Sequence, residues 1–492
     1  MKSPRLACLC LLVSLAVGAR AQLSAPAAPA KGSPTSAAAL RATLDFLASD
    51  DLAGRDSPSR GLDRARDYLI ERVRAVGLAP GVGDGFRHRY TLPGTRLDPG
   101  PLVCRVRGTE GEVVELAVEK DVRVWRADAG YDNEDVEFVR VDFAQPGVDR
   151  MLRAQRGRRP VVVEVEDSSP LWSACAGARS QVARGGRGGA PWLLVRKGVL
   201  PAGDLRGQIS LPAPQAADID LENVVATLRV DGAKEWVLFT AHYDHVGIGA
   251  PRGGDAIYNG ADDDASGSAA VLALAEAFVQ RSPRLTRNLA FVWFSAEEKG
   301  LRGSRAFVED SPLPIADIAA VVNLEMLGRP PAEGPRKAWI TGEDLSDFGA
   351  IARPIFSAHG VDIVDFVMAG QLFYQSDNLP FAQKGVVAHA ISAGSLHQDY
   401  HQPGDEVEKL DLEHMSAVVE AVYAFGVELA SRDERPQYND RGKQTLSGGR
   451  GTRGRRRARD EAPPDGGEDR NTPAGTKPGS NPAANKGGRS GR

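Results

Sequence analysis

The sequence predicts an α/β protein with a mixed central β-sheet flanked by helices, together with a β-rich inserted domain. Short apolar runs rich in Val, Phe and Trp indicate buried strands, for example EWVLFT ahead of His242 and NLAFVWFS ahead of Glu297. Between residues 91 and 211, short β-like runs are separated by Gly, Pro and Asp turns, which predicts the insert. Longer runs with apolar residues at helical spacing predict helices at residues 266–281, 344–360 and 411–431.

The N-terminal residues predict secretion or export to the periplasm. The basic start MKSPR is followed by LACLCLLVSLAVG, which is apolar but too short to span a membrane, and then by a small-x-small cleavage site at residues 19–21. We therefore expect a signal peptide at residues 1–21 and a mature chain that starts near Gln22. Cys104 and Cys175 remain in that chain, and they form either one disulfide or two buried free thiols.

Four further segments follow from composition and periodicity. A linker rich in small residues and Pro is expected at residues 22–38, and helices that pack on the main domain at 39–90. The main α/β domain is expected at residues 221–431, where LENVVATLRV and EWVLFT are predicted to form an antiparallel pair joined by a DG turn. Residues 432–492 have almost no apolar side chains and are predicted to be a disordered tail.

The overall composition sets few limits on function. Of the 492 residues, 42% are hydrophobic and 26% are charged, as is ordinary for a soluble globular protein. The net charge of −4 gives no reason to expect nucleic acid or a membrane as a partner. After removal of the signal peptide, no apolar run is long enough to span a membrane. Any specific function must therefore be argued from local motifs.

Clusters of imidazole and carboxylate groups follow the predicted strands of the main domain. In open α/β sheets, ligands bind beyond the carboxyl ends of the strands, and such groups placed there in series are the donors of a metal site. The pattern therefore predicts a metal-dependent hydrolase. The clusters lie at residues 242–245, 262–264, 297–298, 325 and 397–401.

The first two clusters leave several assignments open. One ring nitrogen of His242 can bind a metal while the other donates to Asp244, and His245 is a competing ligand. Only one of the three aspartates at 262–264 can face a given site in an extended loop. The other two are expected to cap the helix that starts near Ser266.

The remaining clusters supply acids and a last histidine. Glu297 and Glu298 project differently, so one can bind a metal while the other transfers a proton. A carboxylate such as Glu325 at the end of an apolar run is costly unless it is paired or bound to a metal. His397 and His401 are four residues apart, and either could be the last ligand.

The motifs AHYDH, YNGADDDASG, FSAEEKGLRGS, NLEMLGR, SDNLPF and DYHQPGDE occur in this order. Together they resemble the zinc-dependent exopeptidase family of bacterial leucyl aminopeptidases, aminopeptidase Y and glutamate carboxypeptidase. The resemblance covers residues 39–80 and 221–430. The insert is similar in position, though poorly in sequence, to the protease-associated domain that many members carry.

The resemblance implies two zinc ions per chain. In this scheme His242 is a ligand of one zinc and is oriented by Asp244, while Asp263 bridges both ions and is followed by a cis peptide bond. Glu298 and His401 complete the second site, with His401 preferred over His397 because YHxP is the form seen in the family.

The resemblance also implies the remaining roles. Glu297 is the general base, and Tyr400 is a donor to the oxyanion. Glu325 takes the position of a metal ligand that is usually Asp in the family, and Asn378 stands where many members have His. The expected activity is that of an exported aminopeptidase that acts on peptides through metal-activated water. The alternatives are a glutaminyl cyclase-like acyltransferase with one zinc and a non-catalytic relative that serves as a binding domain.

Overall fold

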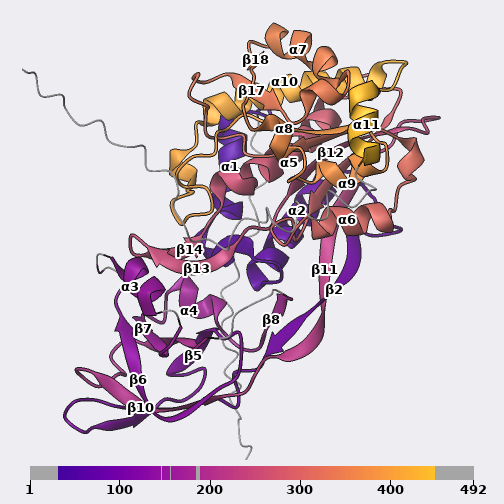
Figure 1. The fold of residues 1–492 in the computed structure, drawn as a ribbon. Coiled ribbons are helices and arrows are strands. Elements are labelled where there is room, and N and C mark those ends of the chain that lie inside the picture. Colours follow the sequence, from indigo (N-terminus) through magenta and orange to yellow (C-terminus); the bar gives the residue numbers. More distant parts are fainter. Residues whose placement is uncertain (1–31, 144, 146, 156, 184–188, 449–492) are drawn as a thin grey trace, which may run out of the picture. The chain divides into compact units, whose positions relative to one another are not determined.

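The computed structural model describes residues 32–143, 145, 147–155, 157–183 and 189–448 (Figure 1). The expected signal peptide and residues 22–31 of the expected linker lie outside this part. Residues 1–443 form one compact unit and residues 444–492 a second, of which only the last turn of α11 (Asp440–Gly448) is described. None of the described helices is both long and apolar enough to cross a membrane.

The centre of the main sheet consists of four parallel strands. β12 (Trp236–His242) lies between β15 (Asn288–Phe294) and β16 (Ile318–Leu324) and is parallel to both. On its other side β16 pairs in parallel with β19 (Ala388–Ser392). Every residue of these strands is buried, which explains their continuous apolar runs. Their carboxyl ends therefore meet at one edge of the sheet.

Further strands extend this centre on both sides to a described total of ten, and most of them pair antiparallel. The predicted mixed sheet is thus confirmed. On one side lie β17 (Lys337–Ile340) and β18 (Asp362–Ile363), and on the other β11 (Gln215–Leu228), β1 (Ala79–Pro80), β2 (Arg87–Leu97) and β8 (Arg179–Val182).

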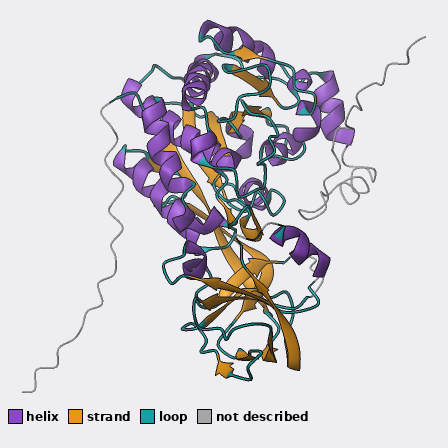
Figure 2. Cartoon of the chain, turned by 90° about the vertical axis from the view of Figure 1, so that its left-hand side faces the viewer, coloured by secondary structure: helices purple, strands orange, loops and turns teal. Residues whose placement is uncertain are grey.

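Helices cover both faces of this sheet (Figure 2). On one face, Phe239 of β12 packs 5.6 Å, centroid to centroid, from Phe278 of α5. On the opposite face, Phe294 of β15 packs 5.7 Å from Phe307 of α6, and Phe381 of α9 joins the same cluster. The predicted helices correspond to α5 (Gly267–Arg281), α7 (Phe348–Ala358) and α10 (Leu412–Ser431). Besides α11 and the helices of the insert, the described α-helices also include α1 (Ala37–Leu47), α2 (Arg60–Ala75), α6 (Arg302–Glu309), α8 (Ala369–Leu372) and α9 (Asn378–Gln383).

The N-terminal helices α1 and α2 pack on the helices of the main sheet. Side chains cap both of their N-termini, because Ser36 accepts a hydrogen bond from the N–H of Ala39 and Ser59 accepts one from Leu62. Arg72 of α2 forms an ion pair of 2.5 Å with Glu276 of α5. Between the two helices lies the short helical segment η1 (Asp50–Arg55).

The predicted hairpin between β11 and β12 is wrong. β15 lies between them, antiparallel to β11 and parallel to β12. The connecting loop spans the width of one strand and is held by Asn288 at the start of β15. The Asn288 side chain accepts a hydrogen bond from the N–H of Val230 (2.8 Å) and donates one to the carbonyl of Ala233 (3.1 Å).

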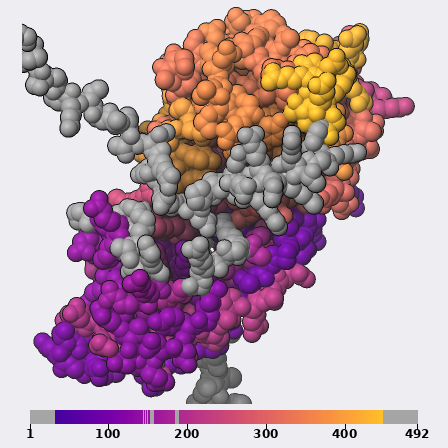
Figure 3. Space-filling model, in the orientation of Figure 1, coloured from indigo at the N-terminus to yellow at the C-terminus, as the bar shows by residue number. Residues whose placement is uncertain are grey.

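The insert forms its own seven-stranded sheet, in the order β4-β3-β10-β6-β7-β9-β5. In Figure 3 its residues, shown in purple, make a continuous surface. Its expected start at residue 91 is too early, because Thr91–Leu97 belong to β2 of the main sheet. The elements of the insert are β3 (Val103–Arg107), β4 (Val113–Glu115), β5 (Val122–Arg126), β6 (Tyr131–Val141), α3 (Val148–Gln155), β7 (Val161–Val165), α4 (Pro170–Ala174), β9 (Trp192–Arg196) and β10 (Leu205–Leu211).

The two cysteines are buried free thiols, so the disulfide alternative fails. Cys104 belongs to the apolar cluster that contains Val162, whereas Cys175 belongs to the cluster that contains Val161 and Val163. Because neighbouring residues of a strand point to opposite faces, the two thiols lie on opposite sides of the insert's sheet.

The chain remains folded beyond residue 432, so the expected start of the tail is too early. Tyr438 is buried, and its hydroxyl donates to the carbonyl of Val386 (3.0 Å). Arg435 forms an ion pair of 2.7 Å with Glu235. One aromatic and one arginine side chain thus fix a stretch that is polar in composition. Residues 449–492 of the expected tail lie outside the described part.

Candidate metal centre

The predicted site residues lie beyond the carboxyl ends of the four central strands. His242 ends β12, Glu297 and Glu298 follow β15, and Glu325 follows β16 directly. The loop after β19 carries His397, Tyr400 and His401, and Asp263 lies in the π-helical turn η2 (Ala261–Ser266) that leads into α5. The apolar composition of the strands thus correctly predicted that these side chains lie at the carboxyl ends of the strands.

Of the three consecutive aspartates, Asp263 is the one that lies next to His242, His245 and His401. Asp264 accepts hydrogen bonds from the N–H groups of Gly267 (2.9 Å) and Met326 (3.2 Å). Asp262 accepts one from Gly328 (2.6 Å). The peptide bond between Asp263 and Asp264 is cis, as the family resemblance implies.

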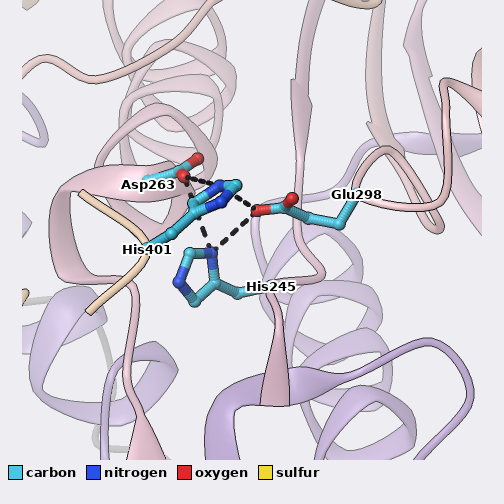
Figure 4. Close-up of side chains that lie close together, drawn as sticks. All are labelled: His245, Asp263, Glu298 and His401. Carbon is cyan, nitrogen blue, oxygen red and sulfur yellow. Dashed lines mark ion pairs between the residues drawn. The ribbon is translucent and has the colours of Figure 1, made fainter. Parts of the chain in front are cut away.

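Four donor atoms converge at one point of this edge, one each from His245, Asp263, Glu298 and His401, all within 4.8 Å of one another (Figure 4). Nε2 of His401 is 3.1 Å from Oδ2 of Asp263 and 3.1 Å from Oε1 of Glu298. Nδ1 of His245 is 3.1 Å from the same glutamate oxygen. This is the spacing expected of ligands around a shared cation.

His242 lies on the other side of Asp263. Its Nε2 atom is 3.3 Å from Oδ1 of Asp263, so the two oxygens of this carboxylate face different histidines. Nδ1 of His242 lies 3.1 Å from the main-chain oxygen of Asp244 but 3.8 Å from its carboxylate. The carboxylate instead accepts a hydrogen bond from the N–H of Glu297 (3.0 Å). The expected contact was with the side chain of Asp244. In the structure, Asp244 orients His242 through its main-chain oxygen instead.

Glu297 and Glu325 do not belong to the group of four donors. Glu325 accepts hydrogen bonds from the hydroxyl of Ser376 and the amide of Asn323. Burial raises the pKa of Glu325 to about 7. Burial and the nearby Glu298 and Asp377 carboxylates raise the pKa of Glu297 well above its usual value. Both acids are therefore able to hold a proton near neutral pH.

Within the group of four donors, Asp263, Glu298 and His401 favour their charged forms. Desolvation lowers the pKa of His401, but the carboxylates of Glu298 and Asp263 outweigh it and raise this pKa to about 10. The histidines in turn outweigh desolvation at both carboxylates and lower their pKa values. The cluster thus holds two ionised acids beside a strongly basic imidazole.

Several buried atoms of the centre have no hydrogen-bond partner. An unpaired polar atom in a protein interior costs on the order of 1–3 kcal/mol, so several together in one place require an explanation. Imidazole nitrogens and carboxylate oxygens are the ligands that zinc prefers in catalytic sites, and the residues therefore fit a zinc centre. The unpaired atoms are Nε2 of His242, both ring nitrogens of His245, Oδ2 of Asp263, Oε1 of Glu298 and Nε2 of His401.

The loop after β19 separates its two histidines. The ring of His397 points to Asp262, with 3.2 Å between Nε2 and Oδ2, and takes no part in the group of four. Tyr400 stacks on His401 with ring centroids 4.0 Å apart. Desolvation and the surrounding carboxylates raise the pKa of the Tyr400 hydroxyl, although 37% of the residue is exposed.

Asn378, which stands where many members of the resembled family have His, is buried and donates to the carbonyl of Phe373 (3.1 Å).

Arg55 is a residue of this site that was not predicted from the sequence. Its guanidinium is buried and donates to the carbonyls of Tyr243 (3.0 Å), Asn259 (2.7 Å) and Gly260 (3.1 Å). These carbonyls belong to the loop after His242 and to the loop ahead of η2, so one side chain joins the two segments that carry ligands. An arginine near a turn carries no periodic signal, and only the fold shows that it is enclosed.

Comparison with known proteins gives a consistent picture. Residues 223–426 match the model of peptidase family M28. Leucine aminopeptidase 1 of Coccidioides posadasii is 30% identical over 223 residues, which span 42% of this chain and 55% of that protein. A probable leucine aminopeptidase of Arthroderma otae is 26% identical over 219 residues, which span 42% of this chain and 56% of that protein. The chain thus spans about half the length of these curated relatives.

Among solved structures, the zinc aminopeptidase BSAP of Bacillus subtilis superposes with a TM-score of 0.48. The two chains are 17% identical, and the superposition covers 82% of this chain and 97% of that one.

Proposed function

We propose that the protein is a zinc-dependent aminopeptidase that removes N-terminal residues from peptides, starting from the match of residues 223–426 to the model of peptidase family M28. The observation that carries the proposal is the position of Asp263, whose two carboxylate oxygens lie 3.3 Å from His242 and 3.1 Å from His401. A carboxylate placed between two sets of ligands suits a pair of cations. The aminopeptidase names of the relatives support the choice of reaction.

We assign one zinc to His242, Asp263 and Glu325, and a second to Asp263, Glu298 and His401. When bound, zinc supplies Lewis acidity toward a carbonyl oxygen and lowers the pKa of water toward neutrality. This assignment is supported by four donor atoms that lack hydrogen bonds and that ligation would give a partner: Nε2 of His242, Oδ2 of Asp263, Oε1 of Glu298 and Nε2 of His401.

Glu297 is the general base of the proposed reaction. It takes a proton from the attacking water and delivers it to the nitrogen of the leaving amine. Burial and the carboxylates of Glu298 and Asp377 raise its pKa, and a higher pKa makes the ionised carboxylate a stronger base. The hydrogen bond from its N–H to Asp244 fixes the backbone that carries it. Tyr400, stacked on His401, is placed as a donor to the developing oxyanion.

The charge of the centre favours an amino terminus over a carboxyl terminus. The ionised carboxylates of Asp263 and Glu298 make the centre negatively charged, and Asp377 and Glu325 lie close enough to Glu297 to raise its pKa. Such a surface attracts a protonated α-amino group and repels a carboxylate.

The N-terminal pattern of residues 1–21 supports a role of this aminopeptidase outside the cytoplasm.

The proposal is tested by counting zinc and measuring hydrolysis of a panel of aminoacyl-4-nitroanilides, for the unaltered chain and for Glu297→Gln. We expect close to two zinc ions per chain, activity in the unaltered chain, and at least ~100-fold slower turnover in the variant with its zinc retained. Glu408→Gln is the control, because this carboxylate is exposed and pairs with Arg41 rather than with a proposed ligand. One zinc with cyclisation of N-terminal glutamine instead of hydrolysis would assign the chain to glutaminyl cyclase chemistry. Absence of zinc would overturn the proposal.

A further inference from the structure

His245 is an unexplained buried histidine at the metal centre. It follows β12 by three residues, its side chain is fully buried, and neither ring nitrogen has a hydrogen-bond partner. Its backbone N–H donates to the carbonyl of Arg55 (3.2 Å), which fixes the main chain at this point. A histidine that only filled space would leave two polar atoms unsatisfied, at a cost that an apolar residue of similar size would avoid.

The surrounding chain is shaped to admit this ring. Gly260 has a positive φ of 58°, and a Cβ atom there would come within 2.5 Å of Cγ and Cδ2 of His245. The imidazole therefore occupies space that any other residue at 260 would close. The side chain is held in one orientation, with Nδ1 directed at the oxygens of Glu298 and Asp263.

The distances from His245 are those of a ligand. In a tetrahedral zinc site with ligand atoms about 2.0–2.1 Å from the ion, neighbouring donor atoms lie about 3.3 Å apart. Nδ1 of His245 lies 3.1 Å from Oε1 of Glu298 and 3.7 Å from Oδ2 of Asp263. His401 lies at 3.1 Å from both of these oxygens, and its ring is inclined at 73° to that of His245, with centroids 5.5 Å apart. The two imidazoles thus approach the same pair of oxygens from different directions (Figure 4).

We propose that His245 is a fourth protein ligand, through Nδ1, of the cation held by Asp263, Glu298 and His401. This inference rests on the proposed zinc centre. It makes the two cation positions unequal, because one has four donors from the chain and the other has three, from His242, Asp263 and Glu325. Four protein ligands are typical of closed zinc sites, whereas three leave a position open. The cation beside His245 is accordingly the first to bind and the last to be removed.

The test measures zinc affinity rather than turnover. The full chain is stripped of metal and titrated with zinc in competition with a chromophoric chelator, and separately with Co²⁺, whose absorption spectrum reports coordination. We expect His245→Gln to weaken binding of the first equivalent of zinc at least ~100-fold, since changes to groups that only hydrogen-bond to a metal ligand already cost about 10–100-fold. The Co²⁺ spectrum of the one-equivalent form should change as well.

The matched control is His414→Gln, since His414 is also buried but has hydrogen bonds of 2.8 Å to Arg336 N and Ala393 O. This variant should bind the first equivalent of zinc as tightly as the unaltered chain does. Equal zinc affinity and an unchanged Co²⁺ spectrum in folded His245→Gln would overturn the inference. X-ray absorption on the unaltered one-equivalent zinc form needs no variant, and it should show two imidazoles, whereas one would also overturn it. Hydrolysis of nitroanilides by the unaltered chain reports separately on the proposed function.

Discussion

Nε2 of His242 lies 3.3 Å from Oδ1 of Asp263, and this contact links the end of β12 to the turn ahead of α5. The second oxygen of the same carboxylate belongs to the group around His401. Asp263 is therefore the one side chain in the described part of the chain that contacts both proposed sets of ligands. Its loss should affect both cation positions at once.

We expect Asp263→Asn to lose most of its zinc. The amide keeps one oxygen donor but replaces the other with an NH₂ group, which cannot bind a cation. Zinc affinity at both positions should fall by more than ~100-fold, which is the upper end of the range for changes to groups that only hydrogen-bond to a ligand. Metal analysis after gel filtration measures the outcome. Asp262→Asn is the control for removing a buried carboxylate at the neighbouring position. It should lower stability, because the amide has one oxygen for the two contacts that Asp262 makes, with the N–H of Gly328 and with Nε2 of His397, but keep the zinc. Equal zinc content in the two variants would contradict the role assigned to Asp263.

Removal of zinc should lower the temperature of unfolding. Without a cation, Asp264, Glu297 and Glu325 lie in one buried region, where desolvation and neighbouring carboxylates raise their pKa values and disfavour their ionised forms. Zinc at 100 times its dissociation constant stabilises the folded state by about 2.7 kcal/mol, so the midpoint should rise by several degrees. Scanning calorimetry with chelator, and again after zinc is restored, measures the shift. An identical midpoint in both conditions would show that the folded state does not bind zinc preferentially.

The sequence could predict where the site lies because buried parallel strands have a distinctive composition. EWVLFT and NLAFVWFS are apolar on both faces of the sheet, and the polar residues that follow them can only lie at its edge. The order of strands was beyond the sequence. The insertion of β15 between β11 and β12 depends on contacts between residues far apart in the chain, and a DG turn between two apolar runs gives no sign of it.

The direction in which individual side chains point could not be predicted from the sequence either. His242 and His245 both follow the same strand, and spacing alone could not decide between them. In the structure both face Asp263, from opposite sides of its carboxylate. The role of the Asp244 main chain depends on local backbone angles that composition does not encode. Tyr438 is likewise a single aromatic residue in a polar stretch, and only its burial against Val386 shows that this stretch is folded.

Arg55 should be the most sensitive position outside the ligands. Arg55→Met keeps much of the volume but leaves the carbonyls of Tyr243, Asn259 and Gly260 without a donor. Because a buried unsatisfied group costs about 1–3 kcal/mol, we expect a loss of about 3 kcal/mol or more in the free energy of unfolding. Zinc affinity should fall as well, since both ligand-bearing loops lose their common anchor.

Urea unfolding at constant zinc measures the stability, with Arg41→Gln as the matched control. Arg41 is exposed and pairs with Asp45 and Glu408, so its loss should change stability by less than ~1 kcal/mol. A similar small change in Arg55→Met would show that the loops do not depend on this side chain.

The stability of the metal-free chain should fall between pH 6.5 and pH 4 because of His389. This histidine is fully buried on β19, where one ring nitrogen donates to the carbonyl of Thr341 (2.7 Å) and the other accepts from the hydroxyl of Ser346 (2.7 Å). Both contacts suit the neutral ring, and burial lowers the pKa of His389 from 6.5 to about 4.

In this window the unfolded chain binds a proton at His389 that the folded chain does not, so the free energy of unfolding decreases as the pH falls. The contribution is complete above pH 6.5 and is lost below pH 4, with a total of about 3 kcal/mol. Urea unfolding with chelator present, at steps between pH 4 and pH 7, measures the slope. His389→Asn keeps a donor to Thr341 but does not titrate, so its slope should be smaller than that of the unaltered chain by up to one proton. Parallel curves for the two chains would mean that His389 is protonated in the folded state as easily as in the unfolded state.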